Sequence, residues 1–173
     1  MLVKLTGAAF IIGACGVYGL SQARTIENRV RHLRSLRFGA AILAREITYI
    51  QNPLPRALEK AVTLASFPAQ ELFKVVMDHL CQGAGYTAAE AWSRGAERLR
   101  DVSDLKAEDI SLIDSFGAQL GMSDVEAQKK AFRLLEEELK LQEQRAAEAV
   151  AAEKKLWSYG GFLLGCLIVL LMI

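Results

Sequence analysis

Charged side chains are confined to the middle of this chain. Of its 41 Lys, Arg, Asp and Glu residues, 40 lie between Arg24 and Lys155, and Lys4 is the exception. Both ends are rich in apolar residues. Because a helix rises about 1.5 Å per residue, each end is long enough, at roughly 27–28 Å, to cross the hydrocarbon of a bilayer. The pattern predicts transmembrane helices at 2–20 and 156–173 and a central domain at 21–155.

Basic residues next to the two predicted spans indicate the orientation. Short segments rich in Lys and Arg are retained in the cytoplasm during insertion, so we expect the central domain to be cytoplasmic. The residues concerned are Arg24, Arg29, Arg31, Arg34 and Arg37 after the first span, and Lys154 and Lys155 before the second. A cleaved signal peptide is the alternative, with Lys4, apolar Leu5–Leu20 and Ser21-Gln22-Ala23 in the usual order. The arginines that follow would oppose its translocation.

The central domain has the apolar periodicity of helices throughout. It predicts helices at 33–50, 55–66, 69–82, 88–102, 106–120 and from 124 into the second span. Short turns with Pro or Gly separate most of them, such as Asn52-Pro53-Leu54-Pro55 and Gly83-Ala84-Gly85. We therefore expect an all-α fold: an antiparallel bundle of five to six helices, flanked by an N-terminal and a C-terminal transmembrane helix.

Two capping boxes and two apolar stripes refine this prediction. Thr87 with Glu90, and Ser123 with Glu126, have the spacing at which side chain and backbone cap each other at a helix start. The stripe of the first bundle helix is Leu33, Leu36, Ala40, Leu43, Ile47 and Ile50. The stripe of the last helix is Val125, Phe132, Leu135 and Leu139. Both stripes are expected to be buried.

The composition argues against several classes of function. The central domain has equal numbers of basic and acidic residues, so no net positive charge favours nucleic acid. The chain lacks a G-x-x-x-x-G-K-[ST] phosphate loop, and its only histidines, His32 and His79, are isolated in the sequence. Its three cysteines are far apart. We expect no catalytic residue, no cofactor and no metal ion.

Gly161 and Gly165 form a small-x-x-x-small pair in the second predicted span. Such pairs let membrane helices approach closely, so these glycines are candidates for transmembrane packing.

Several short motifs, in order along the chain, carry a family resemblance. They are Pro53-Leu54-Pro55-x-Ala57-Leu58-Glu59, Ala89-Glu90-Ala91-Trp92 and Phe116-Gly117-x-x-Leu120-Gly121-x-Ser123-Asp124. Together with the Arg-rich exit of the first span, they make the whole chain resemble the stage III sporulation protein AB family. The soluble part of that family is similar to the F-type cytoplasmic domain of inner-membrane platform proteins in type II secretion and type IV pilus machines. Those proteins carry two domain copies and internal spans, whereas this chain has one domain between two terminal spans.

The resemblance implies a function, a location and partners. It implies a non-catalytic platform component of a sporulation secretion-like channel between mother cell and forespore, in the mother-cell (outer forespore) membrane. The implied partners are the cytoplasmic secretion ATPase of the same operon and ring-forming channel proteins. The residues that define the family, either shaping the bundle or facing a partner, are Pro53, Leu54, Pro55, Leu58, Trp92, Phe116, Gly117, Leu120, Gly121 and Asp124. The alternative is a structural scaffold that forms a coiled coil through its C-terminal helix and has no motor partner.

Overall fold

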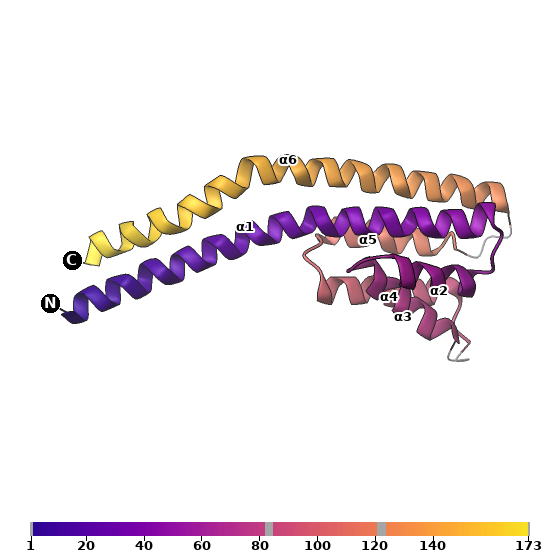
Figure 1. Cartoon of the computed structure of the whole chain (residues 1–173), viewed down its shortest axis with the longest axis horizontal. Coiled ribbons are helices and arrows are strands. Elements are labelled where there is room, and N and C mark those ends of the chain that lie inside the picture. The colour runs from indigo at the N-terminus through magenta and orange to yellow at the C-terminus, as the bar shows by residue number, and fades with distance from the viewer. Residues whose placement is uncertain (1, 82–84, 121–123, 173) are drawn as a thin grey trace. The chain divides into compact units, whose positions relative to one another are not determined.

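The computed structural model describes residues 2–81, 85–120 and 124–172, and these are helical almost throughout (Figure 1). The elements are α1 (Leu2–Ala44), the π-helix η1 (Arg45–Tyr49), α2 (Leu54–Leu64), α3 (Ala69–Cys81), α4 (Ala88–Val102), α5 (Ala107–Gly117) and α6 (Val125–Met172). No strand occurs within the described residues. The all-α fold predicted from the sequence is confirmed.

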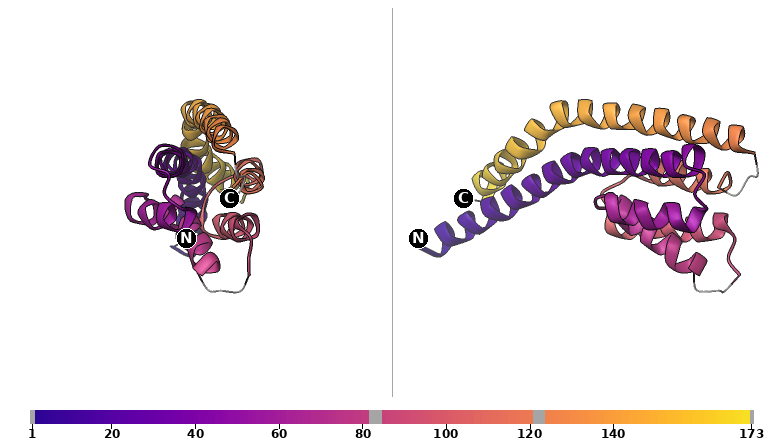
Figure 2. Two further views of the ribbon diagram at one scale, coloured as in Figure 1. Left: turned by 90° about the vertical axis from the view of Figure 1, so that its right-hand side faces the viewer. Right: turned by 45° about the vertical axis from the view of Figure 1, so that its right-hand side comes forward.

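The chain divides into two compact units. Unit 1 comprises Met1–Asn28 and Arg145–Ile173, and unit 2 comprises Arg29–Gln144. Unit 2 is a helical bundle. In it, α3 packs on both α2 and α4, and α4 packs on α5. The parts of α1 and α6 that belong to unit 2 run antiparallel beside this group (Figure 2).

Local signals predicted most helix boundaries to within three residues. The helix predicted at 55–66 is α2, which ends at Leu64, and the one predicted at 106–120 is α5, which ends at Gly117. The first capping box is confirmed, because the Glu90 amide donates to Thr87 Oγ1 at 3.2 Å and the Thr87 amide donates to Glu90 Oε2 at 2.8 Å. Ser123 of the second box lies outside the described residues.

The core of unit 2 contains a chain of aromatic rings. Trp92 lies 6.1 Å from Phe73 and 5.5 Å from Phe116, measured between ring centroids, and Phe116 lies 4.8 Å from Phe132. These rings come from α3, α4, α5 and α6 and are all at least 96% buried. Aromatic side chains of this size dominate the hydrophobic free energy of a small core, so this cluster joins four helices.

Two of the predicted core positions are wrong. Ile50 is 45% exposed and Val125 is 39% exposed. The amide of Ile50 bonds to the carbonyl of Arg45, five residues back, at 3.1 Å. That wider π-turn rotates Ile50 away from the stripe formed by the preceding α-helix, and Ile47 is left only half-buried. Val125 is the first residue of α6 and precedes the part of the helix that packs on the bundle.

The described residues contain no helix whose length and apolar character together suit a membrane span. Of the segments predicted as spans, residues 2–20 belong to α1 and residues 156–172 to α6. Membrane attachment therefore stays a prediction. The surroundings of Gly161 and Gly165 lie outside the described part of the structure, so their predicted packing is untested.

Candidate functional site

The residues singled out from the sequence fall into two groups in unit 2. One group is buried and consists of Leu58, Trp92, Phe116, Gly117 and Leu120. The other lies at the surface and consists of Pro53, Leu54, Pro55 and Asp124, with Leu54 half-buried. Gly121 lies outside the described residues. Only the second group is placed to meet a partner.

The buried group includes a close approach between two helices. The indole Nε1–H of Trp92 donates to the carbonyl of Ile113 at 2.7 Å. A Cβ added at Gly117 would lie 2.7 Å from Cδ1 of Trp92, closer than packed carbon atoms come. This position of the chain therefore suits glycine, because the tryptophan ring occupies the space that a side chain would need. These residues shape the bundle.

The surface group lies at the end of unit 2 where η1 ends and α6 begins (Figure 1). Three apolar side chains are exposed there: Tyr49 (79%), Ile50 (45%) and Val125. We call this end the tip, defined by Tyr49, Ile50, Pro53, Pro55, Asp124 and Val125. The sequence predicted Ile50 and Val125 as core residues, so the apolar character of the tip emerged only from the structure.

A buried carboxylate holds the connection that forms the tip. Glu46 is 5% exposed; its Oε2 accepts from Asn52 Nδ2 at 2.7 Å and lies 3.3 Å from Lys60 Nζ. Burial opposes ionisation, but the hydrogen bonds from Asn52 and Lys60 and the charges of Lys60 and Arg45 outweigh it, so the pKa of Glu46 is lowered. Gln51, between these partners, has a positive φ of 56°. The contacts thus fix a strained turn beneath the exposed apolar residues.

A buried ion pair joins α1 to α5. Arg29 Nε donates to Asp109 Oδ2 at 2.8 Å and Arg29 Nη2 donates to Asp109 Oδ1 at 2.9 Å, a bidentate geometry. Asp109 is fully buried and also accepts from the Lys106 amide at 2.9 Å. The hydrogen bond to Asp109 raises the pKa of Arg29 despite partial burial. From the sequence Arg29 was predicted only as part of the basic exit of a span, because its partner is 80 residues away.

His32 is buried, and its ring accepts a hydrogen bond. Its Nδ1 accepts from the Asp104 amide at 3.2 Å, and its ring packs edge-on against Phe67 at 5.4 Å between centroids. Burial lowers the pKa of His32; the Asp104 charge opposes this effect and the Arg31 charge adds to it. The neutral ring therefore connects α1 to the α2–α3 and α4–α5 connections.

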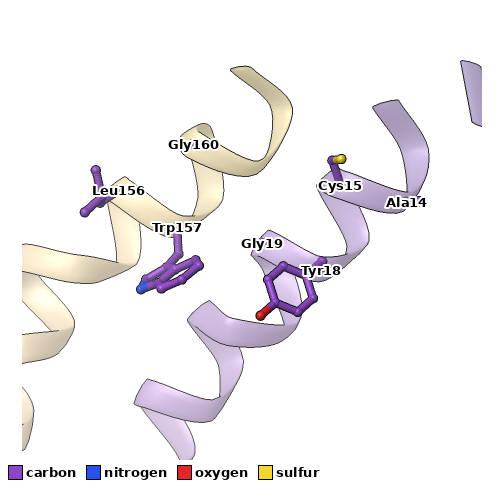
Figure 3. A pocket seen from close by; sticks show the side chains of 7 residues that line it. All are labelled: Ala14, Cys15, Tyr18, Gly19, Leu156, Trp157 and Gly160. Atoms are coloured by element: carbon purple, nitrogen blue, oxygen red, sulfur yellow. The ribbon is translucent and has the colours of Figure 1, made fainter. Parts of the chain in front are cut away.

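Unit 1 contains an apolar cavity of about 490 Å³ between its α1 and α6 segments (Figure 3). It is lined by Ala14, Cys15, Tyr18, Gly19, Leu156, Trp157 and Gly160. The rings of Tyr18 and Trp157 meet edge to face at 6.4 Å between centroids. Nowhere in the described part of the chain do three His, Cys, Asp or Glu side chains gather as a metal site requires.

Comparison with known proteins places this fold in a family. The family model described as stage III sporulation protein AB matches residues 4–173. Stage III sporulation protein AB of Bacillus subtilis (strain 168) is 32% identical over 171 residues, which cover 99% of each chain. A solved structure of a stage III sporulation protein AB has a TM-score of 0.66 and 29% identity, and the match covers 72% of this chain and 97% of that one. Similarity along the whole sequence and in three dimensions thus agrees with the motifs, and the chain belongs to the stage III sporulation protein AB family.

Proposed function

We propose that this chain is a non-catalytic platform component of a sporulation secretion-like channel, and that its tip docks a cytoplasmic secretion ATPase. Family membership supports a function in sporulation. The proposal adds a location in the mother-cell membrane, with spans at 2–20 and 156–173 and unit 2 in the cytoplasm. It also adds a place beside ring-forming channel proteins.

The exposed tip is the observation that carries the docking role. Tyr49 and Ile50 expose apolar surface beside the turn that buried Glu46 holds, and Val125 adds to it from the start of α6. A pre-ordered apolar patch loses little conformational entropy on binding, and large aromatic residues supply most of the binding energy at protein interfaces. Asp124 adds a negative charge beside the patch, which favours a partner surface that carries Lys or Arg.

Binding of the purified ATPase to the full chain in lipid nanodiscs tests this role. The variants Tyr49→Asp and Ile50→Asp each place a charge in the patch and should weaken binding at least about tenfold, the effect expected at an interface hot spot. Leu64→Asp is the matched control. Leu64 is 59% exposed and ends α2, the helix that begins beside the tip, so its substitution should leave binding unchanged.

The binding of the tip variants and of the control decides whether the ATPase docks at the tip. Tip variants that bind the ATPase as tightly as the unsubstituted chain would refute docking at the tip. If Leu64→Asp weakens binding equally, the contact involves unit 2 broadly rather than its tip. Helix content measured by circular dichroism shows whether each variant is folded.

Membrane attachment is tested separately. A reporter that is active only outside the cytoplasm, fused within 21–155, should be inactive, whereas the same reporter fused after the C-terminus should be active. Activity of the central fusion would reverse the proposed orientation.

A structural scaffold remains a second candidate, because Leu134 and Leu141 of α6 are 53% and 40% exposed. Their side chains lie seven residues apart, the spacing of a coiled-coil seam. Sedimentation of residues 123–155 distinguishes the candidates: a stable oligomer of this segment alone favours the scaffold.

A further inference from the structure

The outer face of α1 in unit 2, continued by the first residue of η1, is a basic stripe with an apolar centre. Arg31, Phe38 and Arg45 follow each other at intervals of seven residues, and all three are exposed, Phe38 by 56%. Residues seven apart lie within about 20° of each other around a helix, so these side chains form one line. The buried stripe of α1, which includes Leu36 and Leu43, faces the bundle.

The outer face of α6 in unit 2 carries the complementary pattern. Leu134 and Leu141 are exposed and seven residues apart, and the exposed Glu137 lies between them at a spacing of three and four. Phe132, Leu135 and Leu139 of the same helix are buried in the bundle. The outer line of α6 is therefore apolar with an acidic centre, whereas that of α1 is basic with an apolar centre.

The two lines also match in level along the helices. Within one chain Arg34 Nε bonds to Glu143 Oε1 at 2.9 Å and Arg37 Nε lies 3.1 Å from Glu143 Oε2, which fixes how the antiparallel α1 and α6 are aligned. Phe38 is one residue beyond Arg37 along α1, and Leu141 is two residues before Glu143 in α6. Phe38 and Leu141 therefore lie at nearly the same level.

The charges match at a neighbouring level. Arg45 lies seven residues beyond Phe38, and Glu137 lies four residues before Leu141. Because the helices are antiparallel, both steps lead in the same direction from the level of Phe38 and Leu141. The levels of Arg45 and Glu137 therefore differ by three residues, or about 4.5 Å along the axis. An arginine side chain spans that offset. Neither Arg45 nor Glu137 has an ion-pair partner among the residues that the structure describes.

We propose that α1 of one copy packs antiparallel against α6 of a second copy, with Phe38 on Leu141 and Arg45 paired with Glu137. Two copies inserted through the same spans have the same residues at the same level, so this register needs no relative shift. To that extent the contact rests on the proposed membrane attachment. It does not depend on an ATPase.

Disulfide crosslinking between two copies of the full chain in native membranes tests the contact. One copy carries Phe38→Cys and one tag, and the other carries Leu141→Cys and a second tag, with native Cys15, Cys81 and Cys166 replaced by Ser. A mixed crosslinked dimer bearing both tags is expected. Lys74→Cys in place of Phe38→Cys is the matched control, because Lys74 is also exposed but lies on α3; it should give no mixed dimer.

Charge exchange then separates this contact from non-specific collision. Arg45→Glu on the Phe38→Cys copy should lower the yield of mixed dimer about tenfold, since it sets two acidic groups against each other. Adding Glu137→Arg to the Leu141→Cys copy should restore the yield. Both side chains are exposed to solvent, although the charge of Arg45 also acts on buried Glu46.

Three results would overturn the proposal. They are a yield no higher than that of Lys74→Cys, a reduced yield that Glu137→Arg does not restore, and a Leu141→Cys homodimer that forms in preference to the mixed dimer. The third would indicate contact between two α6 helices. Capture of a different protein at Phe38→Cys in place of the second copy would also overturn the proposal, because it would show another occupant of this face. Mixed dimers found only outside the membrane fraction would leave the contact standing and refute the proposed attachment.

Discussion

The buried pair of Arg29 and Asp109 makes a sharp prediction about stability. The variant Arg29→Met keeps most of the length of the side chain but removes its charge. Fully buried Asp109 would then lose bonds of 2.8 and 2.9 Å and keep the one from the Lys106 amide. Removing one member of a buried ion pair leaves an uncompensated charge and costs about 3–5 kcal/mol of unfolding free energy. We expect a loss of this size.

A second substitution should recover part of that loss. In Arg29→Met combined with Asp109→Leu no buried charge remains, and apolar replacement of a whole buried pair is often close to neutral. What remains lost is the bond from the Lys106 amide at the start of α5, worth about 1 kcal/mol. The double variant should therefore be more stable than Arg29→Met alone by about 2–4 kcal/mol.

Urea denaturation of the full chain in detergent micelles measures these differences. With Trp157→Phe as background, fluorescence comes from Trp92, which is 98% buried in the core of unit 2. Arg34→Met is the matched control: the Arg34 side chain is 64% exposed and bonds to Glu143, so its loss should cost less than about 1 kcal/mol. A double variant no more stable than Arg29→Met would show that the buried charge is not the cause.

The same assay tests three further predictions. Gly117→Ala forces a Cβ to 2.7 Å from the Trp92 ring and should cost about 1–3 kcal/mol, whereas Gly160→Ala, with nothing within 4 Å, should leave this transition unchanged. Thr87→Ala removes the cap of α4 and should cost about 0.5–2 kcal/mol. Burial lowers the pKa of His32 below 6.5 in the folded state. The unfolded chain therefore binds the proton first as the pH is lowered, and the free energy of unfolding should fall as the pH drops through 6.5. His32→Gln should reduce that dependence.

The part of the fold that could be predicted from the sequence is the part that depends on local signals. Prolines after Asn52, the Thr87 capping box and the apolar periodicity each act within a few residues, and together they give the helices and their approximate ends. They also predicted that α6 continues from the bundle towards the C-terminus, and the helix extends without a break through Gly160. The π-turn at Arg45–Tyr49 has no comparable signal, and it reversed the predicted burial of Ile50.

The candidate site was harder to predict because it depends on distant partners. Arg29 reaches Asp109 across 80 residues, and Glu46 reaches Asn52 and Lys60 only because α1 ends in a π-turn. In the sequence, Arg29 is one of several arginines, and Glu46 stands beside Arg45 with nothing to mark it as buried. The motif residues Trp92 and Gly117 were singled out from the resemblance, but a motif does not reveal whether its residues face inward or outward, and both are buried in the structure.

The buried polar contacts of α1 and η1 also constrain how a force could pass through the bundle. Arg29, His32 and Glu46 bind α5, the α4–α5 connection and the turn into α2, respectively. An apolar stripe alone tolerates small rotations and shifts, whereas directional contacts at three levels fix both the rotation and the height of a helix. Sliding α1 past α2–α5 would break all three and leave charged groups unpaired. If a partner at the tip moves unit 2, we therefore expect the part of α1 that belongs to unit 2 to move together with α2–α5 as one body.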